Sequence, residues 1–102
     1  MNKPLILVVE DDTAVRNLIT TTLKAHDYRF LTAANGESAI LEASSHNPEI
    51  ILLDLGLPDI DGVEVIQRVR SWSNMPIIVI ALTFKICIHF HFSIITFLNI
   101  IA

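Results

Sequence analysis

The sequence predicts an α/β fold, in which a parallel sheet is covered by helices on both faces. Apolar runs of strand length, such as Leu5–Val9, alternate along the chain with segments of helical periodicity. Several of these runs are continuously apolar, which is typical of strands buried on both faces. Strands that alternate with helices pair in parallel through right-handed crossovers. We therefore expect a doubly wound parallel sheet.

The elements are expected in the order βαβαβαβ. The strands are predicted over residues 5–9, 28–32, 49–54 and 76–80, and the second is the most polar, which places it nearer a sheet edge. Helix starts are predicted at Asp12-Thr13 and Asn35-Gly36, and a third short helix carries Val63, Val65, Ile66 and Val69. The dipeptide Asn47-Pro48 ends the second helix.

Composition limits the class of protein. The chain has 102 residues, which suits one small domain, and 52% of them are hydrophobic, which argues against disorder. Its net charge of -4 argues against a nucleic-acid surface, because such surfaces are usually basic. The single cysteine, Cys87, cannot form an internal disulfide, so we expect a reducing, cytoplasmic location. The apolar run near the N-terminus is short and ends in three acids, unlike a signal peptide.

Carboxylates follow two of the predicted buried strands. Glu10, Asp11 and Asp12 come directly after the first strand, and Asp54 ends the third. Working residues of such sheets lie at the carboxyl ends of the strands, so these acids meet at one edge if the two strands are neighbours. Clustered carboxylates either raise a pKa or need a cation, and Mg²⁺ prefers such oxygen ligands. An aspartate in such a cluster can also act as a nucleophile toward phosphorus.

Acids near strand ends also have a simpler interpretation, as helix caps. Asp12 precedes a predicted helix, and capping is its favoured role. Asp59 and Asp61 lie in a loop bracketed by Pro58 and Gly62, and we expect them to form turns or to cap the next helix. Asp54 is followed by a loop and not by a helix, so capping does not explain it.

Two stretches of the chain resemble the signature motifs of bacterial two-component response-regulator receivers. They are Val8-Val9-Glu10-Asp11-Asp12 and the segment from Leu52 to Gly62, LLDLGLPDIDG. The order and spacing of both stretches match over residues 4–80. The segment from Asp54 to Ile80 further resembles KdpE-type regulators, through the Leu-Gly-Leu after Asp54 and the Arg-Ser-Trp-Ser segment. The resemblance implies a flavodoxin-like (CheY-like) fold.

The same resemblance implies a role for each matching residue. Asp54 would accept a phosphoryl group from a sensor histidine kinase, here KdpD-like, to control transcription of a potassium-transport operon. Glu10, Asp11, Asp54 and the backbone carbonyl of Gly56 would hold Mg²⁺. The face of the first helix around Thr13, Val15 and Arg16 would help to dock the kinase.

A receiver of this kind is a signalling module and not an enzyme. Phosphatases that form an aspartyl-phosphate need a second acid two residues after the nucleophile, where this chain has Gly56.

The chain departs from the family pattern after its fourth strand. Ala81 stands where the family has a switch Ser or Thr, and Thr83 is only a weak substitute. We therefore interpret residues 1–81 as a partial receiver with four of five βα units, and residues 82–102 as an unrelated apolar tail of frameshift-like composition. The chain contains no match to a DNA-binding effector domain. Two alternatives to a working receiver remain, a non-functional remnant and a kinase-binding decoy without output.

The tail itself has a two-residue alternation from residue 84 to 94, which favours a strand. Cys87, His89 and His91 share one face of that strand, but they are too spread to close a metal site by themselves. The tail is barely long enough for a membrane span and contains Lys85, so membrane insertion is disfavoured. We expect the tail to fill the place of a fifth strand badly or to aggregate. The oligomeric state is left open.

Overall fold

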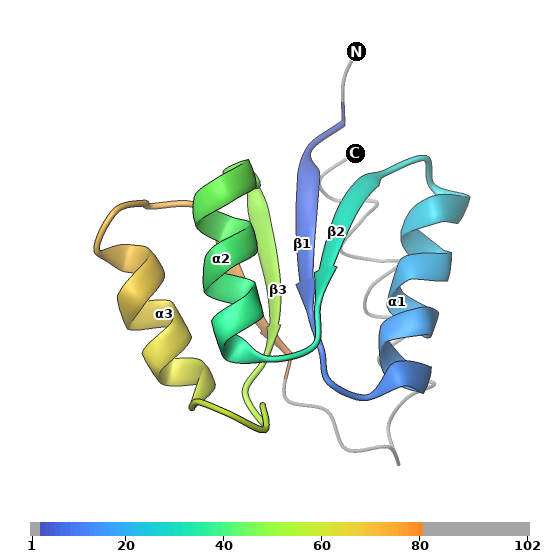
Figure 1. Cartoon of the computed structure of the whole chain (residues 1–102). Helices are drawn as coiled ribbons and strands as arrows, with labels where there is room; N and C mark the ends of the chain where they lie inside the picture. Colours follow the sequence, from blue (N-terminus) through green and yellow to red (C-terminus); the bar gives the residue numbers. More distant parts are fainter. Residues whose placement is uncertain (1–2, 81–102) are drawn as a thin grey trace.

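The computed structural model describes residues 3–80 and contains four strands and three helices within that range (Figure 1). The elements alternate strictly, as the sequence predicts. They are β1 (Leu5–Val9), α1 (Thr13–Ala25), β2 (Arg29–Ala33), α2 (Gly36–His46), β3 (Ile50–Asp54), α3 (Gly62–Arg70) and β4 (Ile77–Ile80). The predicted order is confirmed, and the predicted strand bounds differ by one residue at most.

The sheet has the strand order β2-β1-β3-β4, and every pairing is parallel. The strand predicted to be nearer an edge, β2, is at an edge of the described sheet, and β1 and β3 are neighbours. Helix α1 covers one face of the sheet, and α2 and α3 cover the other (Figure 1). The sheet is therefore doubly wound, with the direction of winding reversing between β1 and β3.

The central strands are buried because both of their faces are covered. Ile6 and Val8 point to the α1 side, where they join Ile19 and Leu23 of that helix in one apolar cluster. Leu7 and Val9 point to the opposite side. These four of the five β1 side chains are at most 1% exposed. The continuous apolar run that predicted this strand thus contributes side chains to the apolar clusters on both faces of the sheet.

The second cluster joins β1 and β3 to α2 and α3. Small residues of α2, Ala39 and Ala43, let that helix approach the sheet closely, and Val65 and Val69 bring the buried face of α3 beside it. The two helices thus pack over the same face, and their first residues lie at the same edge of the sheet (Figure 1).

Each helix begins at a polar cap. Asp12, Asn35 and Asp61 have extended backbones, and each side chain accepts a hydrogen bond from a backbone N–H in the first turn of its helix. The predicted cap Asp12 and the predicted helix start at Asn35-Gly36 are confirmed. At its other end α2 stops at Asn47, whose left-handed backbone (φ 48°) suits an asparagine.

The predictions for Ala81, Thr83 and the tail over residues 82–102 lie outside the described residues. None of the helices found between residues 3 and 80 has the length and apolar character needed to cross a membrane.

Candidate functional site

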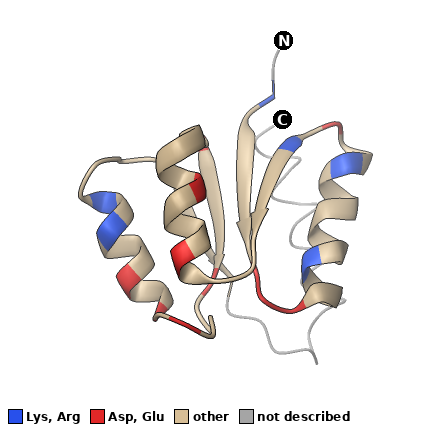
Figure 2. Ribbon diagram, in the orientation of Figure 1, with Lys and Arg blue, Asp and Glu red and all other residues tan. Residues whose placement is uncertain are grey.

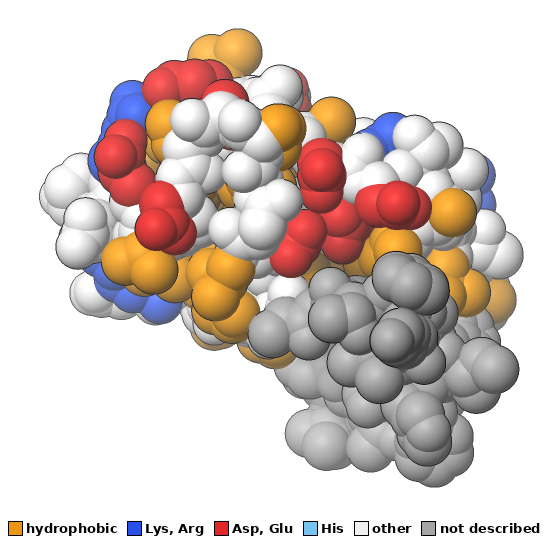
Figure 3. Space-filling view, turned by 90° about the horizontal axis from the view of Figure 1, so that it is seen from below, with side chains coloured by type: hydrophobic (Ala, Val, Ile, Leu, Met, Phe, Trp, Pro, Cys, Tyr) orange, Lys and Arg blue, Asp and Glu red, His pale blue; other side chains and the backbone are white. Residues whose placement is uncertain are grey.

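Acidic residues gather where the strands end and the helices begin. The loops that follow β1 and β3 both carry acids (Figure 2). Seen from below, acidic side chains line this edge of the sheet (Figure 3). This is the edge at which the sequence predicts a site.

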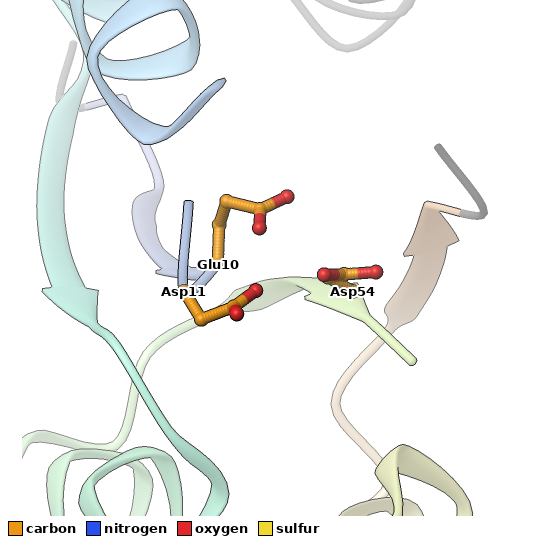
Figure 4. Close-up of side chains that lie close together, drawn as sticks. All are labelled: Glu10, Asp11 and Asp54. Carbon is orange, nitrogen blue, oxygen red and sulfur yellow. The ribbon is translucent and has the colours of Figure 1, made fainter. Parts of the chain in front are cut away.

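Three of these acids form one cluster. Glu10, Asp11 and Asp54 each offer a carboxylate oxygen, and these oxygens lie within 4.8 Å of one another (Figure 4). The register of β1 on β3 explains why these acids are close. Val9 lies opposite Leu53, so the next residues along the two chain segments, Glu10 and Asp54, also lie side by side. The convergence predicted from the sequence is therefore present. Asp12, the fourth candidate, caps α1 instead.

Glu10 is the buried member of the cluster, with 4% of its surface exposed. Its backbone N–H donates to the carbonyl oxygen of Ala33 (3.0 Å), which extends the pairing of β1 with β2 by one residue. Burial raises the pKa of Glu10 to about 7, and the nearby charge of Asp54 adds to this effect. The backbone N–H of Asp12, which donates to Oε2 of Glu10 (3.0 Å), acts in the opposite direction on that pKa.

The loop after β1 is short, and its main chain is held by α1, the helix that follows it. Arg16 of α1 donates from Nη1 to the backbone carbonyl oxygens of Glu10 (2.8 Å) and Asp11 (3.3 Å). Its guanidinium therefore fixes the main chain that carries two cluster acids. The sequence suggested Arg16 only for docking a partner, and this contact within the chain was missed.

The loop after β3 runs over residues 55–61 and is closed at its base. The N–H of Gly62 approaches the carbonyl oxygen of Leu55 (3.4 Å), and a Cβ on Gly62 would lie 2.8 Å from the Cα of Leu55. Only glycine permits so close an approach of backbone. Within the loop, the N–H of Gly56 donates to Oδ1 of Asp54 (3.2 Å), which orients that carboxylate.

The two remaining acids of this loop differ in role. Asp61 caps α3, as the sequence predicts for the next helix. Asp59 instead reaches α2, where Oδ1 accepts from the N–H of Gly36 (2.7 Å) and Oδ2 from that of Glu37 (2.9 Å). The N–H groups of Glu37 and Gly36 lower the pKa of Asp59. Of the two roles expected for Asp59, that of a cap of the next helix is wrong, because its side chain binds the start of α2 and Asp61 caps α3.

The donor set of the cluster suits a hard divalent cation. Three carboxylates face one another, and none of the ion pairs found within residues 3–80 involves them. Uncompensated carboxylates in close contact repel one another, and the charge of Asp54 adds to the rise that burial causes in the pKa of Glu10. Oxygen ligands of this kind, incomplete without water or substrate, are typical of Mg²⁺ sites.

The fold and the acidic edge define the class of protein, and the chain belongs to the response regulator receiver domain family. The family model matches residues 6–87. Receiver domains are signalling modules of two-component systems.

Among curated relatives, the KDP operon transcriptional regulatory protein KdpE of Escherichia coli is 42% identical over 76 residues, which are 74% of this chain and 34% of the relative. KdpE of Staphylococcus aureus is also 42% identical over 76 residues, covering 74% of this chain and 33% of its own length. The chain thus spans about a third of the length of the curated relatives it matches.

Solved structures show the same fold. The chemotaxis response regulator CheY4 of Vibrio cholerae superposes with a TM-score of 0.76 at 24% identity, over 91% of this chain and 81% of that one. The N-terminal domain of a response regulator receiver protein from Methanoculleus marisnigri gives a TM-score of 0.71 at 26% identity, over 85% and 76% of the two chains. The flavodoxin-like, CheY-like fold expected from the sequence is confirmed.

Proposed function

We propose that this chain is a phosphoacceptor module of a two-component phosphorelay and that Asp54 is the residue that takes the phosphoryl group. The observation that carries the proposal is the meeting of Glu10, Asp11 and Asp54 within 4.8 Å at the carboxyl edge of a receiver fold. Asp54 ends a buried strand and is half-buried itself, so its backbone is fixed while its carboxylate stays accessible.

In the proposed reaction a carboxylate oxygen of Asp54 attacks the phosphorus of a phosphohistidine in a sensor kinase. A new P–O bond forms, the P–N bond breaks, and its electron pair stays on the imidazole of the kinase. The N–H of Gly56 holds one oxygen of Asp54 in place, which leaves the other free to react.

We propose Mg²⁺ as the cation of this site, held by Glu10, Asp11, Asp54 and the backbone carbonyl of Gly56. When bound, Mg²⁺ supplies positive charge beside the transferring phosphoryl group. The role of the residues is to present this cation at a fixed place: Glu10 from a buried position, Asp11 from an exposed one. Arg16 supports both acids through their carbonyl oxygens.

The relatives named KdpE favour a particular setting. We propose that the kinase partner is KdpD-like and that the pathway controls transcription of a potassium-transport operon, since E. coli KdpE is described as a regulator of the KDP operon. Phosphotransfer from a KdpD-type kinase, faster than from unrelated sensor kinases, would support this assignment. Equal or slower transfer would contradict it.

The phosphoacceptor is tested with purified 102-residue chain, Mg²⁺ and acetyl phosphate, with uptake followed by intact mass. We expect a gain of one phosphoryl group that disappears in Asp54→Asn and in excess EDTA, and that needs more Mg²⁺ in Asp11→Ala. Asp12→Ala is the matched control, because Asp12 neighbours the cluster but caps α1. This change removes a cap and leaves phosphorylation intact. Uptake that persists in Asp54→Asn would refute the site, and a folded chain that takes no phosphate would favour a decoy.

A further inference from the structure

The Asp59 carboxylate joins two segments that are distant in the sequence. Both of its oxygens accept hydrogen bonds from consecutive backbone N–H groups at the start of α2, at 2.7 Å from Gly36 and 2.9 Å from Glu37. Asn35, the cap of the same helix, accepts from the next N–H, that of Ser38 (2.8 Å). The free N–H groups of this helix start are thus shared between a local residue and a residue of the loop after β3.

Close packing supports the same junction. A Cβ on Gly36 would lie 2.2 Å from Cγ1 of Ile60 and 3.2 Å from Cγ2 of Val65, so the first residue of α2 is in direct contact with the loop after β3 and with α3. Ile60 belongs to the apolar cluster of α2 and α3. The loop is therefore fixed to α2 by a pair of hydrogen bonds and by an apolar contact beside them.

The junction touches the acid cluster from two directions. On one side, the loop that Asp59 holds begins directly after Asp54 and contains Gly56, whose N–H binds the Asp54 carboxylate. On the other side, α2 follows β2 closely, and the last β2 residue, Ala33, accepts the backbone N–H of Glu10. Asp59 thus connects the segment after Asp54 to the segment that holds the main chain of Glu10.

We propose that Asp59 is a positioning residue of the phosphoacceptor site: by fixing the loop after β3 to the start of α2, it sets the spacing between the Asp54–Gly56 side and the Glu10 side of the cation site. This inference rests on the proposed function. Asp59 touches neither the cation nor the phosphoryl group in this scheme. Its effect is on how tightly Mg²⁺ binds and, through Mg²⁺, on the rate of phosphorylation at limiting cation.

A purely structural role would make Asp59 a second cap of α2 and no more. The chain offers a matched control for that possibility, because Asn35→Ala removes the local cap of the same helix without touching the loop. Both Asp59→Ala and Asn35→Ala are expected to lower the melting temperature of the full chain by about 5 °C, as loss of one cap does in a domain of this size. Only Asp59→Ala should also weaken the binding of Mg²⁺.

The experiment measures the dissociation constant of Mg²⁺ by calorimetry, and the initial rate of acetyl phosphate uptake at a series of Mg²⁺ concentrations. We expect Asp59→Ala to raise the dissociation constant about tenfold, as when outer partners of metal ligands are removed. The uptake rate at saturating Mg²⁺ should stay close to that of the unaltered chain. Asp59→Asn keeps one of the two acceptor oxygens, so its Mg²⁺ dissociation constant should lie between those of Asp59→Ala and the unaltered chain. Asn35→Ala should bind Mg²⁺ normally.

Equal Mg²⁺ affinity in Asp59→Ala and the unaltered chain, or an equal loss in Asp59→Ala and Asn35→Ala, would overturn the inference alone. Absence of Mg²⁺-dependent uptake in the unaltered chain would overturn the proposed function and the inference together. If Asp59→Ala does not fold, Asp59→Asn and Gly36→Ala decide. The latter keeps the carboxylate but pushes Ile60 away, and it should also raise the Mg²⁺ dissociation constant. Normal affinity in both would overturn the inference.

Discussion

The loop after β1 and the loop after β3 both lead from a buried strand through the acid cluster to a helix, yet they are held in different ways. The first is three residues long and is fixed by its own helix, through the bonds of Arg16 to the carbonyl oxygens of Glu10 and Asp11. The second is fixed at its base by Gly62 against Leu55, and at its far side by Asp59 on α2. The difference teaches that one side of the site depends on local contacts, and the other on the packing of two further helices.

The change expected to have the largest effect is Gly62→Ala, which attacks the longer loop at its base. The new Cβ would lie 2.8 Å from the Cα of Leu55, and that contact is with backbone, which cannot rotate away. We expect the free energy of unfolding to fall by about 1–3 kcal/mol, as for overpacking elsewhere. Urea unfolding followed by circular dichroism measures it. A loss as small as that of an exposed surface substitution would show that the loop base is adaptable.

The next effect concerns the shorter loop and depends on pH. The pKa of Glu10 is raised from 4.5 to about 7, so the native chain without metal holds a proton that the unfolded chain releases above pH 4.5. Stability from this group is present below pH 4.5 and is lost as the pH rises to 7. Asp11 and Asp54 are the charges that face it.

Glu10→Gln tests this directly, because an amide stays neutral at every pH. In EDTA we expect the variant to match the unaltered chain at pH 4.5 and to be more stable at pH 8 by about 1–3 kcal/mol, at about 1.4 kcal/mol per unit of pKa. Thermal unfolding at the two values gives the comparison. A stability difference that does not change between pH 4.5 and pH 8 would contradict the raised pKa.

A smaller effect is expected from Arg16→Met, which keeps most of the aliphatic side chain of Arg16 and removes its two bonds to the loop carbonyl oxygens. We expect a loss of about 1 kcal/mol in the free energy of unfolding, as for a partly exposed charge-assisted hydrogen bond. The dissociation constant of Mg²⁺ should rise in the same variant. If the affinity for Mg²⁺ is unchanged, the loop after β1 does not need its own helix to hold the acids.

The smallest effect is expected from Arg68→Met. Arg68 forms exposed ion pairs with Glu37 of α2 (3.2 Å) and Glu64 of α3 (3.7 Å). Such pairs contribute little, so we expect a change below about 0.5 kcal/mol. The measurement sharpens the comparison of the two loops, because a larger loss would mean that the surface pair of Arg68 and Glu37, in addition to the bonds of Asp59, holds the segment after β3 to α2.

The sequence predicts the parts of this molecule that depend on local pattern. Continuous apolar runs predict the central strands, and Asp12 and Asn35 predict two helix starts. One general rule about parallel sheets then brings Glu10, Asp11 and Asp54 to a common edge, which the geometry confirms. No contact between individual side chains is needed for this reasoning.

The sequence does not predict the contacts that depend on the path of a loop. Asp59 binds N–H groups more than twenty positions earlier in the chain, and its direction follows from the backbone of the whole segment after β3. Arg16 was assigned only to a kinase-docking face, and helical periodicity cannot show that its side chain turns back to the preceding loop. One signal was available: α2 starts at the same edge with one local cap, which leaves N–H groups for another acceptor.

The strand order described above has a consequence for the rate at which this chain folds. β1 pairs with β2 on one side and β3 on the other, and at least one helix separates the partners of each pair, so none of the four strands within residues 3–80 joins its partner through a tight hairpin. Folding therefore depends on contacts between distant segments, which form slowly. The cation site forms only after β1 and β3 have met, and because α1, β2 and α2 separate these strands in the sequence, we expect that meeting to come late in folding. We accordingly expect Mg²⁺ to slow the unfolding of this chain far more than it speeds its folding.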